Sequence, residues 1–83
     1  IEGGVLAGLP RDVAVALATQ TLAGAGRMLV EAGSTPEELR AQVTSPGGTT
    51  SAGLRALEAA GVRSAFLEAV AAATARSKEL GAT

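Results

Sequence analysis

The sequence predicts a small all-α fold of about four main helices, and three observations support this. Nineteen of the 83 residues are alanine, which has the highest helix propensity of any residue. Residues that favour strands are few, and Phe66 is the one aromatic side chain. Apolar residues recur at helical spacing, and glycine and proline mark the ends of the segments that they form. Closely packed helices without a sheet are therefore expected.

Length, charge and composition exclude several classes of function. A chain of 83 residues makes one domain at most, and a domain of this size buries only about 60–65% of its unfolded surface. A formal charge of −1 offers no basic patch for nucleic acid. No cysteine is present, which excludes disulfides and thiolate metal sites and fits a reducing compartment such as the cytoplasm. No apolar run approaches the roughly 20 residues of a membrane span, so no membrane association is expected.

The first residues, from Ile1 to Gly8, are expected to be the end of a helix that begins upstream. Gly3, Gly4 and Gly8 weaken this segment, so we expect it to fray. No initiator methionine stands at Ile1, and no signal-peptide pattern follows. The chain is therefore expected to be a fragment of a longer protein.

The first full helix is predicted to open at Pro10 and to run to about Ala32. Proline suits the first helical position, Asp12 suits the first turn, and Gly33 is a good stop. Apolar residues fall on two faces, and in so short a chain the second face needs a partner subunit. One face holds Val13, Leu17, Gly24 and Met28, and the other holds Val15, Leu22 and Leu29.

Small and polar residues inside this helix suggest two further expectations. Gly24 and Gly26 cost helix propensity, so we expect them to permit a close helix crossing. The run Thr19–Thr21 interrupts the apolar pattern with polar groups. These groups form either a buried hydrogen-bonded layer or part of a functional surface, and the sequence does not decide between the two.

Two other helices carry clear boundary signals. The run Thr35–Glu38 is a capping box that predicts a short helix over Pro36–Val43. The last helix is predicted over Val62–Leu80, with Gly81 as its stop. Its two apolar stripes hold Val62, Phe66, Ala69, Ala73 and Leu80, and Leu67, Val70 and Thr74, while Arg76 and Lys78 suit the dipole of its last turns.

The stretch Val43–Glu58, V-T-S-P-G-G-T-T-S-A-G-L-R-A-L-E, is where turn formers, hydroxyls and a helix start coincide. Ser45 can cap a helix and Pro46 suits its first position, so the third helix is expected to start near Pro46 or Thr49. It should stop at Gly61. Gly53 is expected to allow close approach of the loop or a neighbouring helix, and Arg55 and Glu58 to form a solvated face.

Three interpretations of this stretch compete on physical grounds. It is either a capped turn between helices or a helix start that binds a carboxylate or phosphate. A phosphate-binding P-loop is excluded, because no lysine follows Gly47 and Gly48. Hydroxyls stand beside the unpaired N–H groups of the first turn, on Thr49, Thr50 and Ser51.

The run Leu39–Glu58, L-R-x-Q-V-T-S-P-G-G-T-T-x-A-G-L-x-x-L-E, resembles the signature of pyrroline-5-carboxylate reductase, the last enzyme of proline synthesis. The residues Gly8–Arg11, G-L-P-R, and Ala69–Gly81, A-V-x-A-A-T-x-R-S-x-E-L-G, are also similar to that family. The resemblance covers nearly the whole chain, but only the C-terminal helical domain of the family. It implies a dimerisation and substrate-binding domain over residues 1–83, without the N-terminal nucleotide-binding domain.

The resemblance also implies a reaction and a site. The intact enzyme reduces 1-pyrroline-5-carboxylate to L-proline with NADPH or NADH, and the cofactor carries the reactive atom. The catalytic group would be the Thr50 hydroxyl, which faces the ring nitrogen. The substrate carboxylate would meet backbone N–H groups of one loop, in which Thr49 has no firm individual role. That loop consists of Ser45, Pro46, Gly47, Gly48, Thr49 and Thr50.

The partners implied by the resemblance are a second copy of the chain and a small imine or proline. Two helical domains interlock in the dimer, and dimers of the family commonly assemble into a decamer. The fragment alone is expected to bind no cofactor and to have no activity, because it lacks a dinucleotide fingerprint. Histidine and cysteine are absent, so no metal site is expected. The alternative is a non-catalytic helical assembly module whose glycine loop is only a turn.

Overall fold

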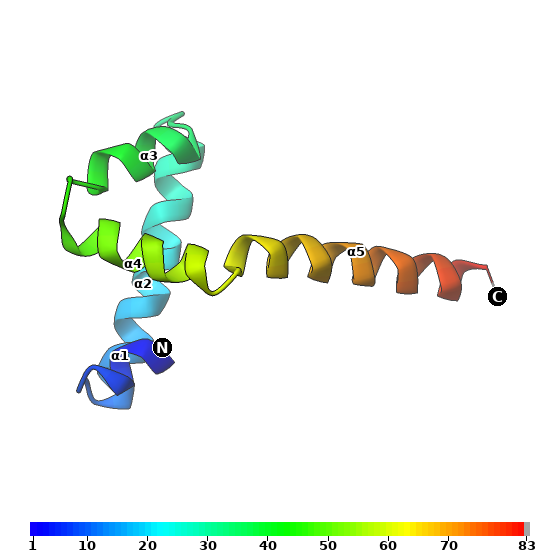
Figure 1. The fold of residues 1–83 in the computed structure, drawn as a ribbon, viewed down its shortest axis with the longest axis horizontal. Coiled ribbons are helices and arrows are strands. Elements are labelled where there is room, and N and C mark those ends of the chain that lie inside the picture. The colour runs from blue at the N-terminus through cyan, green and yellow to red at the C-terminus, as the bar shows by residue number, and fades with distance from the viewer. Residues whose placement is uncertain (83) are drawn as a thin grey trace. The chain divides into compact units, whose positions relative to one another are not determined.

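A computed structural model describes residues 1–82 of the chain, and all regular structure in this range is helical (Figure 1). The predicted all-α class is confirmed, with four main helices preceded by a helix of five residues. The helices are α1 (Glu2–Leu6), α2 (Arg11–Glu31), α3 (Pro36–Val43), α4 (Thr49–Ala59) and α5 (Val62–Gly81).

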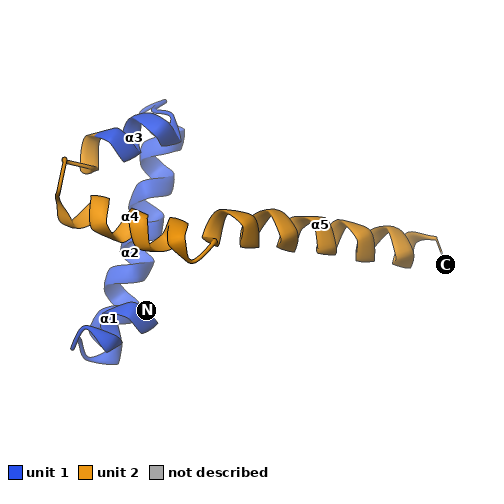
Figure 2. Ribbon diagram, in the orientation of Figure 1, with its two compact units in different colours: residues 1–41 blue, residues 42–83 orange. Residues whose placement is uncertain are grey.

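The chain divides into two compact units, which are coloured separately in Figure 2. Unit 1 is Ile1–Ala41 and holds α1, α2 and most of α3. Unit 2 is Gln42–Thr83 and holds the end of α3, the glycine loop, α4 and α5.

Within unit 1, α1 packs closely on the first turns of α2. A Cβ atom on Gly4 would lie 3.2 Å from the Ala14 Cβ and 3.3 Å from the Leu9 Cδ1. Ala14 is 2% exposed and is the one buried hydrophobic residue in the described range. Arg11 adds a two-pronged ion pair to Glu2, at 2.7 and 3.1 Å. Gly4 therefore does more than weaken a helix, because its small size brings the two helices together.

The predicted ends of α2 are close to those observed. Pro10 occupies the N-cap with φ −57° and ψ 147°, one residue before the helix that it was predicted to begin. Its extended ψ angle keeps Pro10 itself outside the helix. Gly33 has a φ of +69°, as expected for the residue that ends a helix. The close crossing expected at Gly24 and Gly26 is not made within unit 1, since a Cβ on either residue would meet nothing within 4 Å.

Most of the surface of α2 is uncovered in the single chain. Leu22 and Val30 are 77% and 83% exposed, and Thr19–Thr21 is exposed as well, so these polar groups do not form a buried layer within the chain. By length and composition alone α2 could cross a membrane, with 21 residues and a mean hydropathy of 1.4 over its most apolar window. This corrects the expectation that no apolar run approaches that length. Core helices of soluble proteins have the same properties, so the finding is weak evidence for a membrane span.

The capping residue of α3 is the one predicted. The Thr35 Oγ1 accepts a hydrogen bond from the Glu38 N–H at 3.1 Å, and the helix spans Pro36–Val43 as expected. This half of the capping box satisfies one of the N–H groups that a helix start leaves unpaired.

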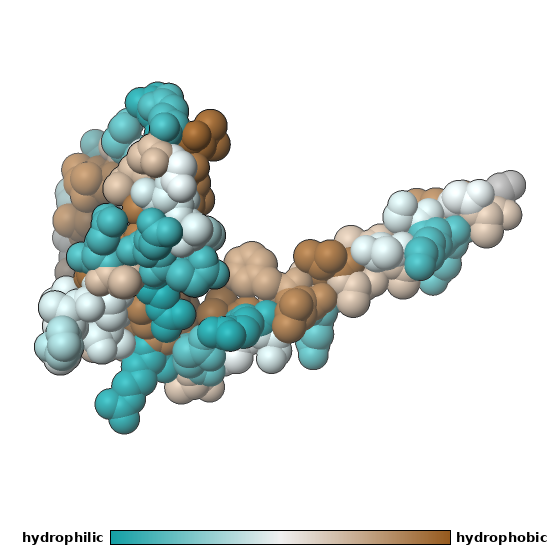
Figure 3. All heavy atoms as spheres, turned by 90° about the horizontal axis from the view of Figure 1, so that it is seen from above, coloured by the Kyte–Doolittle hydropathy of each residue, from teal (hydrophilic) through white to brown (hydrophobic). Residues whose placement is uncertain are grey.

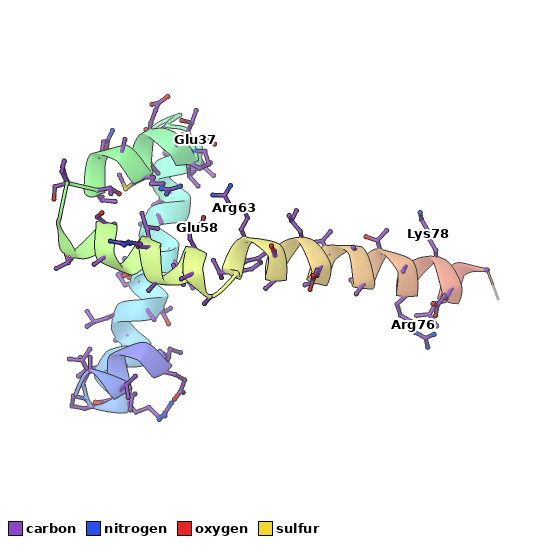
Figure 4. The ribbon with its side chains drawn as sticks, in the orientation of Figure 1. Glu37, Glu58, Arg63, Arg76 and Lys78 are labelled. Atoms are coloured by element: carbon purple, nitrogen blue, oxygen red, sulfur yellow. The ribbon has the colours of Figure 1, made fainter. Side chains whose placement is uncertain are left out.

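Within unit 2, α4 and α5 are joined at Gly61, whose φ is +76°. The Gly61 N–H donates to the Glu58 carbonyl at 3.1 Å, which closes the end of α4 before α5 begins. Arg63 then forms an ion pair with the Glu58 carboxylate at 2.8 Å, and Figure 4 shows both side chains at the joint. The predicted stop is confirmed, with the last helical residue of α4 at Ala59.

The helix α5 presents apolar side chains to the surface, which Figure 3 shows in brown over part of its length. Phe66 is 70% exposed, and Leu67, Val70 and Leu80 are exposed as well. The helix includes Gly81, which was predicted as its stop but is its last helical residue. Near this end Arg76 forms an ion pair with Glu79 at 2.9 Å, while Lys78 lies in the last turn, where a cation suits the dipole.

Candidate functional site

The glycine loop contains a tight turn over Ser45–Gly48. The Gly48 N–H donates to the Ser45 carbonyl at 3.0 Å, which closes a four-residue turn. Pro46 occupies the second position, where its fixed φ is favourable, and Gly47 occupies the third with a φ of +70°. Proline followed by a glycine of positive φ is the pattern of a type II turn.

This turn corrects two expectations about the start of α4. The N-cap of α4 is Gly48, and no side chain caps the helix, so Ser45 is not its cap. The helix begins at Thr49, so Pro46 is not its first residue. The physical reason is that Gly47 takes a left-handed conformation, which interrupts the chain between Pro46 and the helix. Of the two expected starts, the later one is right.

The first turn of α4 offers three backbone N–H groups without an acceptor in the described residues. The first bond inside the helix runs from the Ala52 N–H to the Gly48 carbonyl at 3.1 Å. The N–H groups of Thr49, Thr50 and Ser51 therefore precede the helical ladder, and no side chain caps them. Donors in this arrangement, at the positive end of the helix dipole, suit a carboxylate or another small anion.

Side-chain hydroxyls surround these donors and remain available. Within residues 1–82, the hydroxyl groups of Ser45, Thr49, Thr50 and Ser51 form no hydrogen bond with the protein. Thr50 and Ser51 are half-buried, whereas Ser45 and Thr49 are exposed. The structure thus places all six predicted loop residues in one turn and the helix start that follows it. The structure also shows a third donor, the Ser51 N–H, outside the predicted loop. The position of Ser51 in the first turn of the helix could have predicted this donor from the sequence.

The two glycines of the loop differ in what they require. Gly47 has a φ that only glycine adopts readily, and a Cβ there would meet nothing within 4 Å. Gly48 has a φ of −83° and a ψ of −179°, which any residue can adopt. A Cβ on Gly48 would instead lie 2.5 Å from the Ser45 Oγ and 3.3 Å from the Ser45 carbonyl oxygen. A Cβ at this position would therefore require the Ser45 hydroxyl to rotate away, while the backbone conformation itself would allow any residue.

The chemistry available to this site is binding and orientation. No charged side chain lies between Val43 and Ala52. No group of three or more His, Cys, Asp or Glu residues in the described part of the chain could hold a metal ion. Backbone donors can hold an anion, and hydroxyls can either donate or accept a hydrogen bond. A reaction at this site would need its reactive group from a cofactor.

An all-α domain with uncovered apolar helix faces is typical of a module that assembles with other chains. Comparison with known families supports an assembly module and also identifies the family. The model of the family described as pyrroline-5-carboxylate reductase dimerisation matches residues 1–80. The chain therefore belongs to the pyrroline-5-carboxylate reductase dimerisation family.

Curated relatives match the chain over nearly its whole length. A pyrroline-5-carboxylate reductase of Synechocystis is 54% identical over 80 residues, which are 96% of this chain and 30% of the relative. The enzyme of the same name from Methanosarcina acetivorans is 52% identical, over the same shares. The one from Pisum sativum is 53% identical over 95% of this chain and 29% of its own length. The chain thus spans about 30% of the length of these relatives.

Proposed function

We propose that this chain is the dimerisation and substrate-binding domain of a pyrroline-5-carboxylate reductase. The intact enzyme would reduce 1-pyrroline-5-carboxylate to L-proline in the last step of proline synthesis, in the cytoplasm. Family membership supports the reaction, since the relatives carry that enzyme's name. The observation that carries the site assignment is the start of α4, with three unpaired N–H groups beside a tight turn.

The substrate carboxylate would bind to this helix start. It is the permanent negative charge of the substrate, and the N–H groups of Thr49, Thr50 and Ser51 present donors at the positive end of α4. No carboxylate side chain lies in the loop to repel it.

The Thr50 hydroxyl would face the ring nitrogen of the substrate. It lies on the residue that also supplies the central backbone donor, so a five-membered ring held by its carboxylate would bring its nitrogen close. Thr50 as a residue is half-buried, and its hydroxyl forms no hydrogen bond with the described protein. A hydroxyl suits this position because it can donate or accept as the nitrogen changes its protonation.

The hydride would come from NADPH or NADH on a nucleotide-binding domain of the intact enzyme. The residues of this chain would bind and orient the imine against that cofactor. Positioning of this kind contributes to catalysis, because the reaction rate falls steeply when the bound reactant is misplaced. The ring nitrogen would also take up one proton, which solvent would supply, so none of the residues proposed here needs to carry charge.

The other role of the domain would be self-association, which its family membership supports. Leu22 and Val30 on α2 and Phe66 on α5 are largely exposed in the single chain, and a second copy would cover such side chains. Interfaces of stable homodimers commonly bury roughly 2,000 Å² or more. We extend the proposal to a homodimer that assembles further into a decamer.

A crystal structure of the intact reductase with L-proline would test the site. The carboxylate is expected within hydrogen-bond distance of the N–H groups of Thr49, Thr50 and Ser51, with the ring nitrogen next to the Thr50 hydroxyl. Pyrrolidine, which lacks the carboxylate, is the matched control and should not bind at concentrations at which proline does. Proline bound elsewhere, with the loop empty, would favour the alternative in which the glycine loop is only a turn.

A further inference from the structure

We propose that a second copy of this chain completes the hydrophobic core of the domain, so that folding and dimerisation are a single step and the domain has no stable folded monomer. The inference concerns the apolar surfaces of α2 and α5. It rests on the self-association proposed above and goes further, because two chains that fold separately can also dimerise.

Neither compact unit encloses a hydrophobic core within the described residues. Ala14 is the one buried residue of unit 1, and residues 42–82 of unit 2 contain none. Sixteen of the twenty large apolar residues (Ile, Leu, Val, Met and Phe) are exposed, and none of the twenty is buried. A helix in a protein stays folded mainly because its apolar face packs on a neighbour. The helices of this chain therefore need an apolar surface that neither unit supplies by itself.

An unfilled hollow in unit 1 shows where this core is incomplete. The hollow has a volume of about 340 Å³ and lies beside the contact of α1 with α2, where Ala14 forms part of its lining. Seven of its eight lining residues are apolar or glycine, and Thr21 is the eighth. Leu17 and Leu22 line its α2 side and are exposed. Apolar side chains of another chain would fill this hollow, and their burial would extend the small core that begins at Ala14.

Size and composition leave a second chain as the remaining source of stability. Each unit holds about 40 residues, a length at which a chain usually needs disulfides, metal ions or oligomerisation to stay folded. The sequence contains no cysteine, and no cluster of three or more His, Cys, Asp or Glu residues in the part of the chain that the structure describes could hold a metal ion. Oligomerisation is left, and the family to which residues 1–80 belong is named for dimerisation. The partner is therefore a second copy of this chain.

Thermal unfolding of the 83-residue chain at several protein concentrations tests the inference. If folding and dimerisation are one step, the melting temperature falls as the protein is diluted. For two chains of 83 residues, the average unfolding enthalpy per residue predicts a fall of about 4 °C for each tenfold dilution. Helix content by circular dichroism and dimer content by light scattering should disappear together, over the same range of concentrations.

Phe66→Asp provides a second measurement, because it places a charge on the exposed apolar face of α5. This variant should lose helix as well as dimer, at concentrations at which the wild-type chain is folded. Lys78→Ala, on the same helix, is the matched control and should keep both. A Phe66→Asp chain that was monomeric but still helical would overturn the single step.

Failure of this inference can be distinguished from failure of the proposed self-association. A wild-type dimer whose melting temperature did not change with concentration, or that became a helical monomer on dilution, would overturn the single step and leave self-association intact. The core would then form within one chain. A wild-type chain that was helical and monomeric at high micromolar concentration would overturn both the single step and the self-association.

Discussion

The Ala14 Cβ lies 3.2 Å from the point at which a side chain on Gly4 would begin, and this approach joins α1 to α2. Ala14 is the residue that this contact buries, with 2% of its surface exposed. The Glu2–Arg11 ion pair lies at the same end of unit 1 but is exposed to solvent. Exposed ion pairs contribute little, so close packing of the two small residues is the main attachment of α1.

Gly4→Leu should therefore lower stability by about 1–3 kcal/mol, because the larger side chain pushes α1 away from α2. Gly3→Leu is the matched control, since a Cβ on Gly3 meets nothing within 4 Å and leucine favours helix. Thermal unfolding of both variants, followed by circular dichroism, would measure the difference. Equal melting temperatures for the two variants would show that the contact between Gly4 and Ala14 does not contribute to stability.

The Glu2–Arg11 pair predicts a small dependence of stability on pH. The hydrogen bond that the Glu2 carboxylate accepts from Arg11 lowers the pKa of Glu2 below its ordinary value of 4.5. The unfolded state therefore takes up a proton first as the pH falls, so the contribution of the pair is full above about pH 4.5 and is lost as the pH falls through the lowered pKa of Glu2. Melting temperatures of wild type and Glu2→Gln, measured from pH 7 to pH 3, should differ slightly at pH 7 and converge at pH 3. Added salt should shrink the difference at pH 7, and a gap that widened on acidification would contradict the assignment.

The joint between α4 and α5 depends on the left-handed conformation of Gly61, whose φ is +76°. Gly61→Ala should cost about 1–2 kcal/mol, because a Cβ is disfavoured in this conformation. Gly61→Asn should cost less, since asparagine tolerates it better than other residues. Chemical denaturation of the two variants beside wild type would give both values. If alanine were tolerated as well as asparagine, the joint would not need its left-handed residue.

Exposed apolar side chains predict that the protein self-associates. Phe66→Asp should weaken the dimer by placing a charge in the interface, whereas Lys78→Ala, on the same helix, should leave it nearly unchanged. Light scattering of both variants across a range of protein concentrations would measure the dissociation constants. Wild-type protein that remained monomeric at high micromolar concentration would contradict self-association.

Sequence reasoning predicted those parts of the fold that local chemistry determines. The start of α3 follows from the Thr35 cap and Pro36, and Gly33 and Gly61 end helices because each takes a positive φ. The role of Gly4 could not be predicted in this way, because its contact with Ala14 joins two helices. The close crossing expected at Gly24 and Gly26 also depends on packing, and no helix of unit 1 supplies it.

In the candidate site, too, some features could be predicted from the sequence and others could not. Its residues were predicted together because they are contiguous, and the structure keeps them in one turn and one helix start. The expectations that Ser45 caps α4 and that Pro46 is its first residue were wrong, because Ser-Pro followed by two glycines suits both a capped helix start and a type II turn. Only the φ of +70° at Gly47 decides between these two structures.

Thr50 tests the central claim, that the start of α4 orients the imine, most directly. No side chain caps α4, so the Thr50 hydroxyl contributes little to stability, and Thr50→Ala should cost about 1 kcal/mol at most. In the intact reductase the same change should lower kcat/KM by about 10²-fold, because the ring loses its orientation. Thr50→Ser should keep most of the activity, and Thr50→Val should resemble Thr50→Ala.

The decisive measurement is kcat/KM for these three variants beside their melting temperatures. The account predicts a large loss of rate for alanine and valine at nearly unchanged melting temperature. A Thr50→Ala enzyme with the rate of wild type and a much lower melting temperature would contradict it, and Thr50 would then serve the helix alone.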